Sequence, residues 1–443
     1  MSDRVRIGGL DRLFVGTPVW VCVGPVAPAG REAIVKSLKA FSREDALNRI
    51  GLMPRPGTSG WEFDHDYPQR AVIEVPAGAR SRDQRVGMLN AVLGTSPDVP
   101  MAVAEQGDTL ILYFDHSVGD ACFMVDVAAA ITWASSVDTY TPAVEPNVRF
   151  PLALALLNSV RSAPLQCAVD AFSALFDAFA RVLRVIVGSA RRRSAGQARV
   201  HAPEEAYQAV VATSASDHIS RLNQFMKANG IAASPSAVTM LSVCRALESE
   251  GIAVDSGVEV LVDLRRFLPR GRNTYANLAG VVTVRYGRNS TYEQFGSDVA
   301  ESIRSTRPVV KLLGHIALER VRSVFTSRKP RRGWAPAPGR PDGKATITFT
   351  DVSRAGIPKL FNFSASTNRQ VLIAAPPATG SHLTIAICSA AKGELQLSAT
   401  YFPSQFDGEK IERALRAALI VPDERDLPAA RDAHANPDAI DTA

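Results

Sequence analysis

The feature that most restricts the fold of this chain is an order of helices and strands that occurs twice, on either side of a dissimilar middle segment. In residues 10–134 and again in 216–420, short apolar strands alternate with segments whose apolar residues recur every three or four positions. The segment between them contains proline-punctuated loops, an apolar helical stretch and a run of three arginines. The pattern predicts an α/β protein with two similar halves, and the length allows two domains of about 220 residues.

We expect four regions along the chain. Residues 1–150 form an N-terminal half, 151–210 an interdomain crossing, 211–420 a C-terminal half, and 421–443 a disordered polar tail. The expected strands are 19–23, 71–75, 101–104, 109–115, 258–264, 345–350, 370–375, 383–388 and 394–401. The expected helices are 30–50, 121–134, 216–229, one that Ser234 caps with Pro235 at its first position, 291–306 and 408–420.

Composition and charge exclude several classes of protein. The five cysteines are scattered, without CxxC spacing or a nearby histidine, so we expect reduced thiols and no metal site. The net charge of +6 favours anionic partners such as CoA, a phospholipid or an acidic carrier protein. The basic residues are not interleaved with aromatic ones, and no nucleotide-binding motif is present. We therefore expect no nucleic-acid partner.

Two segments without charged residues are candidates for a targeting or membrane segment. Residues 13–30 resemble a signal peptide in composition, but Asp3, Asp11 and the internal Gly and Pro residues argue against that interpretation. The alternation at 19–23 favours a first strand instead. Residues 370–391 are divided by two prolines and a glycine, whereas a spanning helix needs about 20 uninterrupted apolar residues. The sequence therefore predicts a cytoplasmic protein.

The most informative motif is His116-Ser117-Val118-Gly119-Asp120, which joins the expected strand 109–115 to the helix 121–134. A histidine at a strand end can project into a cleft, and its pKa near 6.5 suits it to accept a proton at neutral pH. Asp120 can fix the loop. Taken alone, the spacing leaves open that His116 is an ordinary loop histidine and that Asp120 is only the N-cap of the helix.

His116 and Asp120 resemble the HxxxD motif of the chloramphenicol acetyltransferase-like, or condensation-domain, superfamily of acyltransferases. That superfamily includes peptide-synthetase condensation domains, plant BAHD enzymes, mycobacterial polyketide-associated acyltransferases and wax-ester synthase/diacylglycerol acyltransferases. Residues 260–280 (VLVDLRRFLPRGRNTYANLAG) resemble its "vdlR…P…N…G" segment, and 349–356 (FTDVSRAG) stand where members often have an SN-x-G turn. Residues 393–407 resemble the closing strand and helix start. The resemblance covers about residues 10–420, and freestanding bacterial members are the most similar.

Three positions depart from the family pattern. Asp115 stands where many members have a first histidine, and Ala121 stands where most have glycine. Thr350 and Asp351 replace the usual Ser-Asn pair, although a hydroxyl remains. Members with a single histidine are familiar, so the pair of His116 and Asp120 is retained.

The resemblance implies two chloramphenicol-acetyltransferase-like domains, each a mixed sheet with helices, that face each other across a central tunnel holding His116. His116 would act as general base on an acceptor hydroxyl or amine while that group attacks the thioester of an acyl-CoA or an acyl carrier protein. Asp120 would point away from the substrate and pair with Arg265, for which Arg266 is the rival. Thr350 would donate a hydrogen bond to the developing oxyanion. No bound cofactor or metal is implied.

We therefore expect an acyltransferase, with an apolar, lipid-like acceptor favoured. The alternative is a protein of this fold that binds a lipid or a carrier protein without chemistry, and Asp115 and Ala121 are its best support.

The crossing adds a hypothesis about membranes. Apolar residues in 168–193 recur every three or four positions, and Arg191, Arg192 and Arg193 stand at its end. This pattern predicts an amphipathic helix that lies on a lipid surface as a peripheral contact. The competing interpretation is that its apolar face packs on its own domain.

Overall fold

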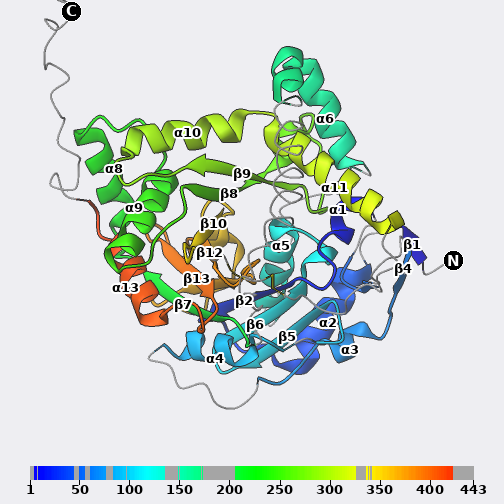
Figure 1. The fold of residues 1–443 in the computed structure, drawn as a ribbon. Helices are drawn as coiled ribbons and strands as arrows, with labels where there is room; N and C mark the ends of the chain where they lie inside the picture. Colours follow the sequence, from blue (N-terminus) through cyan, green and yellow to red (C-terminus); the bar gives the residue numbers. More distant parts are fainter. Residues whose placement is uncertain are drawn as a thin grey trace, which may run out of the picture.

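The protein consists of two β-sheet halves, each covered by helices (Figure 1). The computed structural model describes residues 4–6, 8–43, 49–54, 60–75, 83–95, 97–134, 148, 150–170, 172, 205–325, 336–337, 339 and 342–422. The N-terminal half contains a four-stranded sheet with the order β11-β2-β6-β5, and the C-terminal half contains a six-stranded sheet with the order β7-β13-β12-β10-β8-β9. A small third sheet joins β1 (Arg4–Arg6), β4 (Gly60–Phe63) and β3 (Leu52–Met53).

The N-terminal sheet is built around β6 (Thr109–Asp115), all of whose residues are buried. It pairs antiparallel with β2 (Pro18–Gly24) and with β5 (Met101–Gln106). The fourth strand, β11 (Gln370–Ala374), comes from the second half of the sequence and pairs with β2. The expected boundary at residue 211 therefore does not divide the molecule into two self-contained pieces of chain, because β11 completes the N-terminal sheet.

The C-terminal sheet is mixed. Its strands are β7 (Gln208–Thr213), β8 (Gly257–Asp263), β9 (Ala279–Arg285), β10 (Thr346–Asp351), β12 (His382–Cys388) and β13 (Gln396–Tyr401). Strand β10 runs parallel to both of its neighbours, β8 and β12, and the other pairs are antiparallel. Alternate residues of β8 and β10 enter a core that they share with the three helices α9, α10 and α13.

The helices begin where local sequence signals place them. The described helices are α1 (Gly9–Arg12), α2 (Gly30–Arg43), α3 (Tyr67–Arg70), α4 (Gln84–Val92), α5 (Ala121–Thr132), α6 (Pro151–Ser162), α8 (His218–Ala228), α9 (Pro235–Ser249), α10 (Tyr292–Arg304), α11 (Arg307–Phe325), α12 (Ile357–Leu360) and α13 (Gly408–Ala418). Ser234 caps α9 by accepting a hydrogen bond from the amide of Ala237, as expected. A capping box formed by Thr291 and Gln294 begins α10. Two short 3-10 helices, η1 (His116–Val118) and η2 (Leu264–Phe267), follow β6 and β8.

One expected strand is absent from the described structure, and two expected segments lie outside the described residues. The expected strand 71–75 is wrong, because only one bridge, between Val72 and Val103, joins it to β5; its apolar residues pack on the core without forming a ladder. Residues 423–443 and most of 168–193 lie outside the described residues. Helix α11 was not expected from the sequence.

No single helix among the described residues is long and apolar enough to cross a membrane. One pair of consecutive helices, Pro151–Ser162 and Pro164–Asp170, reaches that length and composition together, but the chain bends by 120° between them.

Leu372→Ala is expected to destabilise the N-terminal half, because Leu372 is fully buried in β11 and its truncation leaves a cavity in the N-terminal core. Truncation of a buried leucine costs about 2–5 kcal/mol. Chemical denaturation followed by tryptophan fluorescence, to which the buried Trp20 and Trp61 contribute, measures this loss.

The matched control is Val160→Ala, because the Val160 side chain is 44% exposed. This substitution should change the denaturant concentration at the unfolding midpoint little. If Leu372→Ala unfolds at the same denaturant concentration as the wild type, β11 is not an integral strand of the N-terminal sheet.

Candidate active site

Strand β6 ends at Asp115, and the turn η1 carries His116 out of the sheet. Asp115 caps this turn: its carboxylate accepts hydrogen bonds from the amide and hydroxyl of Ser117 and from the amide of Gly16. It is only 7% exposed. Asp115 therefore has a structural task, which is to hold the turn and the segment before β2.

His116 is held on several sides. Its amide donates to the carbonyl of Thr17 at 2.8 Å, and its ring stacks on Phe14 with 4.7 Å between ring centroids. The carbonyl oxygen of His116 accepts a hydrogen bond from Nδ2 of Asn277 at 2.7 Å. The side chain keeps partial exposure, whereas its Nδ1 atom is buried and has no hydrogen-bond partner among the described residues.

Burial lowers the pKa of His116 below its ordinary value of 6.5, because the charged imidazolium is poorly solvated there. The carbonyl oxygen of His116, the charge of Asp115 and the side chain of Asn277 oppose this effect only in part. His116 is therefore neutral at pH 7, which is the state that a general base requires.

Asp120 makes two kinds of contact at once. One carboxylate oxygen caps α5 by accepting from the amides of Cys122 (3.1 Å) and Phe123 (3.2 Å). The other accepts a charge-assisted hydrogen bond from Nη2 of Arg265, on η2 of the C-terminal half. Burial raises the pKa of the Asp120 carboxyl, and Arg265 and the amide of Phe123 offset part of that rise.

Arg265 is the partner that the sequence predicted, and the predicted pair is confirmed. The side chains of Arg265 and Asp120 are 11% and 7% exposed. Arg265 also donates from Nε to the carbonyl of Thr274 at 2.9 Å and lies 3.1 Å from a carboxylate oxygen of Asp263. The rival, Arg266, is exposed and lies over the ring of Phe267 instead.

A segment of the C-terminal half, residues 274–277, contacts the HxxxD turn at further points. The carbonyl of Tyr275 accepts from the amide of Asp120 at 3.2 Å, and the Tyr275 hydroxyl donates to Asp126 of α5 at 2.9 Å. Asn277 donates from its amide and from Nδ2 to Asp11, at 2.9 and 3.0 Å.

From the sequence alone, Asn277, Tyr275 and Asp11 were not expected to contribute to the site. The available signal was a polar residue, Asn277, directly before the apolar alternation of β9.

The two positions on either side of Asp120 differ in whether they can carry a side chain. A Cβ at Gly119 would lie 2.4–2.7 Å from side-chain atoms of Phe123, so glycine is required for that close approach. Ala121, at the position where the resembling HxxxD proteins usually have glycine, is the exposed first residue of α5 and has ordinary helical geometry. The alanine therefore does not disturb the turn.

Thr350 makes no contact with this cluster among the described residues. It stands on β10 opposite Ala386 of β12, and alternation places it on the face of the sheet that points away from the core shared with α9, α10 and α13. Its side chain is partly exposed, and its hydroxyl has no hydrogen-bond partner among the described residues. The structure thus joins His116, Asp120 and Arg265 in one site, while no contact links Thr350 to them.

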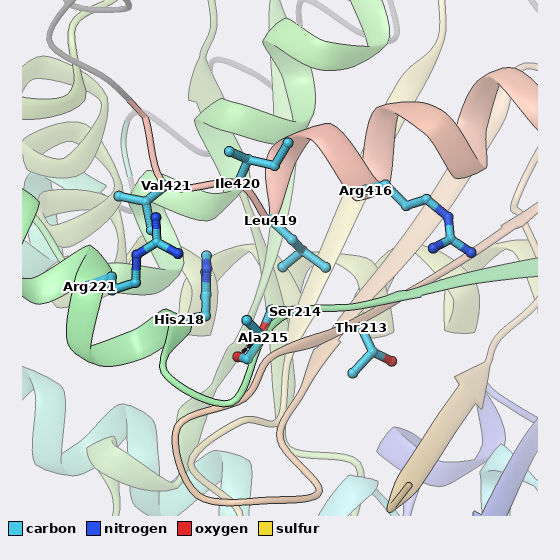
Figure 2. A pocket seen from close by; sticks show the side chains of 9 residues that line it. All are labelled: Thr213, Ser214, Ala215, His218, Arg221, Arg416, Leu419, Ile420 and Val421. Carbon is cyan, nitrogen blue, oxygen red and sulfur yellow. Dashed lines mark hydrogen bonds between the residues drawn. The ribbon is translucent and has the colours of Figure 1, made fainter.

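A pocket of about 270 Å³ lies elsewhere, between α8 and the end of α13 (Figure 2). It is lined by Thr213, Ser214, Ala215, His218, Arg221, Arg416, Leu419, Ile420 and Val421. None of these residues contacts the HxxxD turn. Among the residues that the structure covers, no three His, Cys, Asp or Glu side chains lie close enough together to hold a metal ion.

Comparison with solved structures identifies the fold. The chain is similar to trichothecene 15-O-acetyltransferase from Fusarium sporotrichioides (TM-score 0.58, 12% identity, covering 94% of this chain and 95% of that one). It is also similar to the first condensation domain of the CDA synthetase (0.56, 12%, 94% and 97%) and to polyketide synthase associated protein 5 from Mycobacterium tuberculosis (0.53, 12%, 94% and 97%).

Neither the known family models nor the curated protein sequences gave a match. The structural likeness confirms the two-half, chloramphenicol-acetyltransferase-like fold that the sequence predicted.

Asp120→Asn is expected to destabilise the protein by about 3–5 kcal/mol, because it leaves Arg265 as a buried charge without its main partner. Asparagine still caps a helix, so the lost stability reports on the ion pair and not on the cap. Urea denaturation measures the change in the free energy of unfolding.

Asp263→Asn is the matched control, since Asp263 also contacts Arg265 but is 58% exposed; an exposed ion pair contributes about 1 kcal/mol or less. Equal effects of the two substitutions would contradict the assignment of Asp120 as the main partner.

Proposed function

We propose that this protein transfers an acyl group from an acyl-CoA or an acyl carrier protein to a hydroxyl, or alternatively an amine, of an apolar, lipid-like acceptor. The observation that carries the proposal is a neutral, partly exposed histidine at a strand end, held by contacts from both halves of the molecule. The fold supports it, because an acetyltransferase and condensation domains have the same fold.

In the proposed reaction, Nε2 of His116 accepts the proton of the acceptor hydroxyl while the oxygen attacks the thioester carbonyl carbon. The new C–O bond forms and the C–S bond breaks in the collapse of the tetrahedral intermediate. The thiolate of CoA or of the carrier's phosphopantetheine leaves and receives the proton from His116. No acyl-enzyme forms, and the chain needs no resident cofactor for these steps.

The negative charge on the intermediate's oxygen requires a donor, and Thr350 is our candidate. Thr350 is partly exposed, and its hydroxyl makes no hydrogen bond with a described residue, so the hydroxyl is available to donate. A preorganised donor of this kind contributes about 10²–10³ in rate. Asp120 and Arg265 are positioning residues, because their charged groups are satisfied by each other and by the backbone.

A lipid-like acceptor is supported by exposed apolar side chains on and beside α6 and the helix Pro164–Asp170, which we call the exposed apolar surface. These side chains, with their exposed fractions, are Phe150 (74%), Leu157 (46%), Val160 (44%), Leu165 (83%), Val169 (58%) and Phe172 (75%). Exposed apolar side chains gathered in one stretch mark contact surfaces. The amphipathic stretch and the three arginines that follow in the sequence favour an anionic membrane as the surface contacted.

His116→Ala is expected to lower acyl transfer by about 10²-fold or more while the protein stays folded, because it removes the general base. Release of free CoA from acyl-CoA and a panel of long-chain alcohols measures the rate. In the wild type, kcat/KM should be constant above neutral pH and fall as the pH drops through a pKa below 6.5, since protonated His116 cannot accept a proton.

Near wild-type turnover by His116→Ala would contradict the assignment. No acceptor-dependent release by the wild type would favour the alternative of a lipid- or carrier-binding protein without chemistry.

Leu165→Asp combined with Val169→Asp is expected to reduce binding to vesicles that contain anionic phospholipid, because both side chains belong to the exposed apolar surface. Flotation with vesicles of phosphatidylcholine and phosphatidylserine, at low salt, measures the bound fraction. Ser162→Asp adds charge to α6 at a polar position and is the control. If the wild type does not float with either lipid composition, the surface serves intramolecular packing or a protein partner.

A further inference from the structure

We infer that the pocket between α8 and the end of α13 binds a small carboxylate with a short apolar chain, whose carboxylate contacts His218 and Arg221 (Figure 2). The cavity of about 270 Å³ equals the volume of several water molecules at roughly 30 Å³ each, and it is too small for a whole acyl-CoA. The site is independent of the proposed function, because none of its residues contacts the HxxxD turn.

His218 is the observation that indicates a ligand. It is the first residue of α8 and is only 3% exposed, yet it lines the pocket. Its Nε2 atom is buried and has no hydrogen-bond partner among the described residues. Buried polar atoms are nearly always hydrogen-bonded, so a partnerless ring nitrogen in the wall of a cavity indicates a partner that comes from outside the chain.

Arg221 supplies a positive charge at the same place. It follows His218 by three positions, so the two side chains lie on one face of α8. Its guanidinium is exposed and forms no ion pair with a described residue. Burial and the charge of Arg221 lower the pKa of His218, so the imidazole is neutral at pH 7 and can donate from Nε2–H. A carboxylate can accept from this group and from the guanidinium together.

The other polar side chains at the pocket are already engaged. The hydroxyl of Ser214 accepts from the amide of Leu395 at 2.9 Å and donates to the carbonyl of Ala215 at 3.0 Å. Arg416 donates to the carboxylate of Glu412 at 2.6 and 3.0 Å. Among the described residues that line the pocket, none is acidic. A single free cation beside a neutral donor suits a monoanion better than a dianionic phosphate.

The apolar side of the pocket explains why the ligand carries a chain. Leu419, Ile420 and Val421 follow the end of α13 and line the cavity together. Ile420 is 69% exposed, so this wall is open to solvent and a ligand chain would cover it. Each CH₂ group that is buried there should strengthen binding by about fourfold.

Isothermal titration calorimetry on the full-length protein tests the site with four probes: hexanoate, acetate, 1-hexanol and inorganic phosphate. We expect saturable binding of hexanoate, and binding at least about 10-fold weaker for each of the other three. Acetate lacks the chain, 1-hexanol lacks the charge, and phosphate has no apolar part. In spectra of ¹⁵N-histidine-labelled protein, hexanoate should shift the ring signals of His218.

Three variants separate the contacts. Arg221→Gln should weaken hexanoate binding by about 10-fold or more, because a hydrogen bond to a charged group is lost. Ile420→Ser should weaken hexanoate binding but leave acetate binding unchanged. Lys227→Gln is the matched control: it removes one charge from an exposed position on α8 that does not line the pocket, so binding should stay unchanged.

The inference is overturned if the wild type shows no saturable binding of hexanoate, if the His218 signals do not move, or if Arg221→Gln and Lys227→Gln have equal effects. Tighter binding of phosphate or 1-hexanol than of hexanoate also overturns it. Both tested pocket residues are exposed, so these variants are expected to fold. No measurement uses acyl transfer, so an active enzyme that binds no carboxylate would refute this inference alone.

Discussion

The ion pair between Asp120 and Arg265 is the interaction on which the arrangement of the site depends. Both groups are almost fully buried, and the pair joins the helix after the HxxxD turn to the turn after β8. A buried charge without its partner is costly, so separating the two halves at this point is unfavourable. In the same arrangement, Tyr275 and Asn277 contact Asp120 and His116 of the turn and Asp126 of α5.

This arrangement reconciles two requirements of the proposed base. His116 must be neutral, which burial provides by lowering its pKa, and it must still reach substrate, which its partial exposure provides. The carboxylates nearby do not interfere, because Asp115 is engaged in capping its turn and Asp120 is engaged by α5 and Arg265. The two departures from the family pattern at Asp115 and Ala121 are thus compatible with catalysis.

Structural features that depend on residues close together in the chain could be predicted from the sequence. Contacts between residues far apart in the chain could not. The strand at 109–115, the turn and the cap at Asp120 follow from local patterns, and the Arg265 partner followed from family resemblance. Asn277 and Asp11 are 266 positions apart, and β11 joins a sheet whose other strands end by residue 115; neither contact leaves a local periodicity. Thr350 matched the family position, but no contact among the described residues joins it to His116.

If His116 promotes direct transfer between two bound substrates, the protein itself is never acylated. Rapid quenching of the wild type with acyl-CoA in the absence of acceptor, followed by intact-protein mass spectrometry, measures this. We expect an unmodified protein mass and no burst of free CoA until an alcohol acceptor is added. A burst equal to the enzyme concentration, with an acyl adduct on the protein, would contradict it.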